Sequence, residues 1–74
     1  MDGLTVARNI HYVTDEGIHL AALVTKVWNK DAGLINLSAF IDNSVYTGDP
    51  VMMVTSVNYS DEPLPNTWHW IERA

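Results

Sequence analysis

Four clusters of turn-forming residues divide this 74-residue chain into five short segments. Glycine, proline, asparagine, aspartate and serine recur in these clusters, and glycine supplies the positive φ that tight turns require. The clusters lie at residues 14–17, 29–33, 42–50 and 60–66. The segments between them are rich in β-branched and aromatic residues and show no sustained apolar stripe at helical spacing. The chain is therefore expected to fold into short strands.

The predicted strands follow this division closely. They cover residues 6–13, 18–28, 34–41, 51–59 and 67–71. In the third, every second residue is apolar and is assigned to one face of the strand: Ile35, Leu37, Ala39 and Ile41. In the fourth, the same alternation assigns another set to a common face: Val51, Met53, Thr55 and Val57. The second segment is apolar on both faces, as expected of a bent strand shared by two halves of a barrel.

The spacing of the segments predicts one all-β domain spanning residues 1–74. The loops are short, which favours antiparallel neighbours, because a parallel pair needs a long crossover connection. Closing five strands into a small barrel also leaves few exposed strand edges. We expect an SH3-like antiparallel barrel, with an OB-like barrel as the second choice. The loop at residues 42–49 is the place where one short helical turn could form.

The chain contains no cysteine. Disulfides, thiolate zinc sites and cysteine nucleophiles are therefore excluded. Hydrophobic residues make up 47% of the sequence, which is enough for one small core. A chain of this length commonly needs a disulfide, a metal or a partner for stability. We therefore expect association with protein, either as a homo-oligomer or within a larger assembly.

The charge of the chain argues against two classes of partner. The chain has four basic and nine acidic residues, which gives a formal net charge of −5. The basic residues are scattered along the sequence: Arg8, Lys26, Lys30 and Arg73. A nucleic-acid backbone or an anionic membrane would repel such a chain, so neither is an expected partner. The longest apolar run has five residues, which predicts no transmembrane helix.

The sequence carries no motif typical of an enzyme or of a cofactor site. No serine lies in a glycine-rich elbow, and the four glycines are isolated rather than grouped around a phosphate. Three histidines, His11, His19 and His69, could meet around a metal if their strands were neighbours. Their spacing along the chain gives no pair on one strand or helix face, so each is expected to lie separately on the barrel surface. We predict no catalytic residue, no cofactor and no metal.

Aromatic residues are the strongest remaining signal. Three tryptophans occur in the chain, and Trp68 and Trp70 stand two residues apart, so they share one face of a strand with His69 opposite. This face is either core or an exposed contact site, since tryptophan and tyrosine are common in both. The candidate partner-binding residues are Trp28, Tyr59, Trp68, His69 and Trp70.

The ending Pro-Asn-Thr-Trp-His-Trp at residues 65–70 carries a resemblance that extends over most of the chain. Earlier parts of the chain carry the same resemblance. They are Arg8, His11-Tyr12, Ala-Leu-Val-Thr-Lys-Val-Trp at 22–28, Asn-Leu-Ser-Ala-Phe at 36–40 and Thr-Ser-Val at 55–57. In these features the chain resembles short proteins encoded by tailed bacteriophages and prophages, which mostly have no assigned function. In that group the final tryptophan is usually followed by proline, where this chain has Ile71.

The resemblance implies a small β-barrel phage product and no transferable catalytic residue. Together with the small core and the aromatic residues, it leads us to expect a non-enzymatic protein that acts through protein–protein contact in a virion or the host cytoplasm. One alternative is an adaptor that binds a short extended or proline-rich host peptide in an aromatic groove. A third, weaker option is a small enzyme with its active site between subunits.

Overall fold

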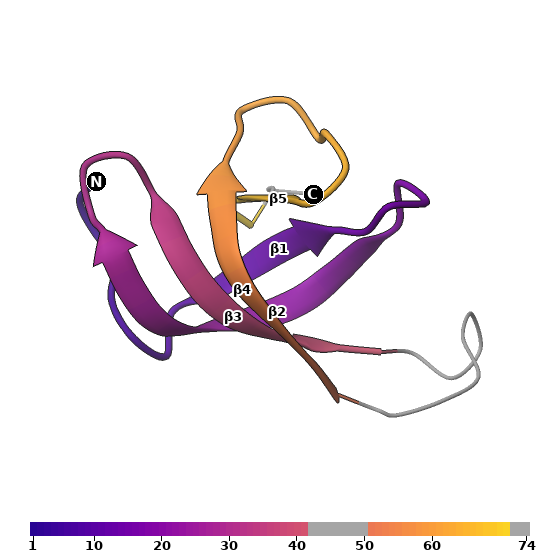
Figure 1. Cartoon of the computed structure of the whole chain (residues 1–74), viewed down its shortest axis with the longest axis horizontal. Coiled ribbons are helices and arrows are strands. Elements are labelled where there is room, and N and C mark those ends of the chain that lie inside the picture. The colour runs from indigo at the N-terminus through magenta and orange to yellow at the C-terminus, as the bar shows by residue number, and fades with distance from the viewer. Residues whose placement is uncertain (42–50, 72–74) are drawn as a thin grey trace.

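Five strands close into a barrel in the order β1-β2-β3-β4-β5 in the computed structural model, which describes residues 1–41 and 51–71 (Figure 1). The strands are β1 (Asn9–Val13), β2 (His19–Asn29), β3 (Leu34–Phe40), β4 (Val51–Tyr59) and β5 (Thr67–His69). The described residues contain no helix, so the predicted all-β barrel is confirmed. The helical turn expected within residues 42–49 lies outside the described residues.

The first and last strands are shorter than predicted. β1 begins at Asn9 because Ala7 adopts a φ of 71°, which interrupts the extended backbone. The Ala7 N–H instead donates to the carbonyl oxygen of Val24 at 2.7 Å. β5 ends at His69 and has only three residues.

β2 is the long bent strand that the sequence predicted. Its first half pairs with β1, from Val13↔His19 to Asn9↔Leu23, while nearly its whole length pairs with β3. Two register shifts interrupt the β3 pairing, between Val24 and Lys26 and between Val27 and Asn29. Bulges of this kind bend a strand and increase its twist, so one strand can serve both sides of the barrel.

The core lies inside the barrel and is formed by alternate residues of the strands. Of the four residues that alternation assigned to one face of the third strand, Ile35, Leu37 and Ala39 are buried, and Ile41, which follows the end of β3, is partly buried. Leu4, which precedes β1, joins this core although no strand pattern marked it. The other buried members of the cluster are Ile10, Tyr12, Leu20, Ala22, Val24, Val57 and Trp68.

The predicted face of β4 is wrong for part of the strand. Ile35 pairs with Val57 and Leu37 pairs with Val54, so two residues of β4 lie opposite one residue of β3. Ser56 occupies this bulge with a φ of 55°, and its N–H donates to Asn36 Oδ1 at 2.9 Å. The extra residue reverses the alternation. As a result Val57 points inward, whereas Val51 and Met53 are exposed.

One strand pair departs from the antiparallel expectation. β5 pairs antiparallel with β1 but parallel with β4, through Asn58↔Thr67 and Tyr59↔Trp68. The chain between β4 and β5 arches away at the top of Figure 1 and returns beside the end of β4. The short parallel ladder needs only this short connection, because it pairs β5 with the last two residues of β4. β5 thereby closes the barrel.

Candidate functional site

Trp68 is a core residue and not a contact residue. Its side chain is 0% exposed, and its indole nitrogen donates to the carbonyl oxygen of Gly33 at 2.7 Å. The hypothesis that Trp68 forms an exposed contact surface is therefore wrong. The Trp68 ring fills the interior space between the two sides of the barrel.

Tyr59 and Trp70 lie beside Trp68 and are half-buried. Both rings meet the Trp68 ring edge-on, at centroid distances of 4.9 Å for Tyr59 and 5.0 Å for Trp70. The outer side of Trp70 is occupied by Arg8, whose guanidinium carbon lies 5.6 Å from the ring centroid. These two aromatic residues therefore extend the core towards the surface.

Trp28 lies apart from the other tryptophans in the described structure. Its side chain is 54% exposed at the end of β2, and its indole nitrogen donates to Asn36 Oδ1 at 2.8 Å. The Lys26 ammonium lies 3.9 Å from the ring centroid, in cation–π geometry. Of the five candidate contact residues, Trp28 alone keeps a largely exposed side chain among the described residues.

Exposed apolar side chains gather instead on the outer face of β2, β3 and β4. The register aligns Ala21, Phe40 and Val51 in one row across the three strands. The next row is Leu23, Ser38 and Met53. We call these six residues the β2–β3–β4 face.

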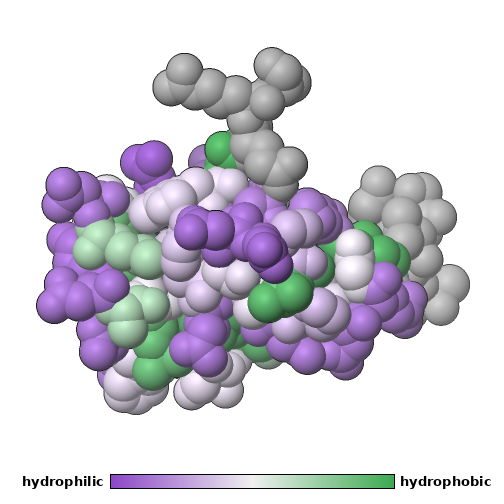
Figure 2. Space-filling model, turned by 90° about the horizontal axis from the view of Figure 1, so that it is seen from above, coloured by the Kyte–Doolittle hydropathy of each residue, from purple (hydrophilic) through white to green (hydrophobic). Residues whose placement is uncertain are grey.

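Three members of this face are large and exposed: Phe40 at 43%, Val51 at 44% and Met53 at 79%. None of the six side chains carries a charge. The face drawn in Figure 2, seen from above the view of Figure 1, shows small hydrophobic areas among hydrophilic residues. Scattered apolar residues are ordinary on a protein surface, whereas adjacent ones mark a contact site.

The structure also brings His11, His19 and His69 together, and we call them the histidine cluster. His11 pairs directly with His69 across β1 and β5, and His19 on β2 lies diagonally across from His11. The ring centroids are 5.4 Å apart for His11–His69, 6.3 Å for His11–His19 and 5.0 Å for His19–His69. One ring nitrogen from each residue lies within 4.8 Å of the other two.

The expectation that the three histidines lie separately is therefore wrong. That expectation took into account only pairs of histidines on a single strand. Side chains on one face of neighbouring strands are also close in space. All three point to the outside of the barrel, because their neighbours Tyr12, Leu20 and Trp68 point into the core. His69, placed among the contact residues, is only 7% exposed and belongs to this cluster.

A hollow of about 270 Å³ opens beside the histidine cluster. His19, His69, Asp61 and Pro63 line it. Asp61 also accepts a hydrogen bond from the Tyr59 hydroxyl, and this bond raises the pKa of Tyr59 above its ordinary 10.0. The hollow thus combines two imidazoles with one carboxylate.

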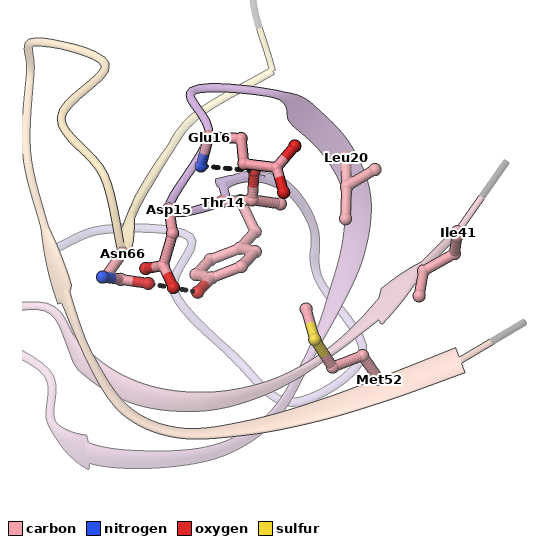
Figure 3. A pocket seen from close by; sticks show the side chains of 8 residues that line it. Thr14, Asp15, Glu16, Leu20, Ile41, Met52 and Asn66 are labelled. Carbon is pink, nitrogen blue, oxygen red and sulfur yellow. Dashed lines mark hydrogen bonds between the residues drawn. The ribbon is translucent and has the colours of Figure 1, made fainter. Parts of the chain in front are cut away.

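A second hollow, of about 260 Å³, lies at one end of the barrel (Figure 3). Leu20, Ile41 and Met52 form its apolar side, while the turn at residues 14–16 and Asn66 form the polar side. The Tyr12 hydroxyl donates to Asn66 Oδ1 at 3.0 Å across its base. Its volume falls below the roughly 300 Å³ at which small-molecule sites begin.

Comparison with known proteins returns no relative. No protein family, curated protein or solved structure matches this chain. The described residues contain no helix that could cross a membrane. The features of this chain that bear on function are the β2–β3–β4 face and the histidine cluster.

Proposed function

We propose that this chain is a non-enzymatic β-barrel module of a phage or prophage that acts through protein–protein contact, as a structural or accessory component of the virion. The observation that carries the proposal is the β2–β3–β4 face, where Phe40, Val51 and Met53 are large, exposed and adjacent. The phage origin is supported by the sequence resemblance ending in Thr-Trp-His-Trp.

A second copy of the chain is the proposed occupant of this face. The whole chain carries a net charge of −5, so two copies repel each other wherever charged surfaces meet. The β2–β3–β4 face has no charged side chain, so two copies can pair there without burying a charge. Association also suits a cysteine-free domain of this size, because it removes further apolar area from water.

Sedimentation of the wild type and of Met53→Asp tests the proposal. We expect the wild type to dimerise, and the variant to remain monomeric because it places two carboxylates at the contact. Met53 is 79% exposed, so the variant should keep the unfolding midpoint of the wild-type monomer. Asn58→Asp is the matched control, since it adds the same charge at another exposed position of β4.

Mass spectrometry of particles purified from a phage that encodes the chain tests its place in the virion. We expect the chain to be present in stoichiometric amounts. A wild type that stays monomeric at high concentration and is missing from the particles contradicts the proposal. Dimerisation that survives in Met53→Asp would place the contact elsewhere on the barrel.

A further inference from the structure

We propose that the histidine cluster binds one divalent transition-metal ion, and that this ion fastens the short strand β5 to β1 and β2. His11, His19 and His69 come from three neighbouring strands, so one ion bound to all three would cross-link the seam at which the barrel closes.

The distances in the cluster are close to those of a bound metal. Zinc lies about 2.0–2.1 Å from each histidine nitrogen in tetrahedral sites, which sets the nitrogens roughly 3.3 Å apart. In this structure the three nitrogens lie within 4.8 Å of one another. Small rotations of the imidazole rings can supply the remaining difference, because the second side-chain torsion of histidine has a broad energy minimum.

The ligand set and its surroundings select the kind of ion. Three imidazoles suit zinc, copper, nickel and iron rather than calcium or magnesium, which prefer oxygen. Three protein ligands leave a fourth position for water or a carboxylate. Asp61 lies on the wall of the adjacent hollow, and the net charge of −5 attracts a cation.

The position of the cluster indicates a structural role for the ion. β5 has three residues and is held by three pairs with β1 and two with β4. Beside the cluster and on the same outer face of the sheet, Val13 of β1 pairs with both His19 and Thr67 and is 0% exposed. A metal bridging His19 and His69 therefore spans β1 next to a buried apolar side chain. Small domains without disulfides often gain their stability from such a metal.

Zinc titration of the full-length chain, prepared without a histidine tag, tests the inference. Calorimetry should show one Zn²⁺ bound per chain. The melting temperature should rise by about 10–20 °C at a hundredfold excess of free zinc over its dissociation constant, since the ion binds the folded state. Addition of a chelator should reverse this rise.

Single variants then assign the binding to the cluster. His19 is exposed, so His19→Gln should leave the zinc-free melting temperature unchanged. It should weaken zinc binding at least roughly 100-fold, because even removal of an outer partner of a metal ligand costs 10–100-fold. Thr25→Gln, at another exposed position of β2, is the matched control and should bind zinc like the wild type.

His11→Gln provides a second test and should weaken zinc binding to a similar degree. His69 is 7% exposed and is left unchanged, because its replacement could unfold the barrel. A wild type that binds no zinc overturns the inference. So does a His19→Gln or His11→Gln variant that binds zinc as tightly as the wild type.

Discussion

The indole nitrogen of Trp68 donates a 2.7 Å hydrogen bond to the carbonyl oxygen of Gly33, 35 residues earlier in the chain. This bond joins β5 to the turn between β2 and β3 through the interior of the barrel. The Gly33 N–H in turn donates to the carbonyl oxygen of Asn29 at 2.9 Å. The buried polar atom of the largest core side chain is thereby satisfied, as burial requires.

Trp68→Phe should destabilise the barrel by about 2–4 kcal/mol. The change leaves the Gly33 carbonyl without its indole donor and creates a cavity in the core. Chemical denaturation monitored by circular dichroism measures the loss. Trp28→Phe is the matched control, because it makes the same chemical change at a ring that is 54% exposed. Equal losses in the two variants would contradict the core role of Trp68.

Gly33→Ala should destabilise the chain more than Gly17→Ala. Both glycines have a positive φ, of 74° and 80°, so alanine is strained at either position by about 1–2 kcal/mol. At Gly33 the added Cβ would also lie 2.7 Å from the Cβ of Tyr59, whereas at Gly17 it meets nothing within 4 Å. The difference in unfolding free energy between the two variants measures this clash. If the two variants had the same unfolding free energy, Gly33 and Tyr59 would not be packed as closely as the structure shows.

The Tyr59–Asp61 pair should make stability depend on alkaline pH. The hydrogen bond to the Asp61 carboxylate is the main cause of the raised pKa of Tyr59, with burial and the negative charge of Asp61 adding to it. A pKa that is higher in the folded state gives stability that is complete below the ordinary value of 10.0. That stability is lost as the pH rises through the folded-state pKa.

Tyrosinate absorbance and denaturation at about pH 8 and about pH 11 check this dependence. Asp61→Asn should lower the pKa of Tyr59 towards its ordinary value and reduce the alkaline loss of stability. Glu62→Gln is the control, because it removes an exposed carboxylate from the next position. If both variants titrate like the wild type, the pair does not govern the pKa of Tyr59.

Several features of the fold could be predicted from the sequence because they are local. Turn residues mark where the chain must reverse, and alternation in β3 assigns Ile35, Leu37 and Ala39 to the core. The length of β2 and its apolar residues on both faces indicate a strand shared by two sides of a barrel. Phe40, which follows Asn36 and Ser38 on the other face of β3, was the available signal for an exposed apolar surface.

The candidate sites depended on relationships that local patterns do not contain. At the Ser56 bulge two residues of β4 face one residue of β3, so the alternation reverses and Val57 points inward although Met53 points outward. The histidine cluster depends on which strands are neighbours: His11 and His69 are 58 positions apart in sequence and form a direct pair in the sheet. Spacing along one strand shows only which residues of that strand share a face, and it does not show which strands are neighbours.

The sequence by itself determined the all-β architecture, the approximate strands and the charge. Each of these follows from turn chemistry, side-chain alternation or composition, which act within a few residues or over the whole chain. Only the tertiary structure decided that Trp68 is core, that Met53 is surface and that three histidines meet. These outcomes depend on strand register and barrel closure, which bring distant residues together and are set by the packing of the whole core.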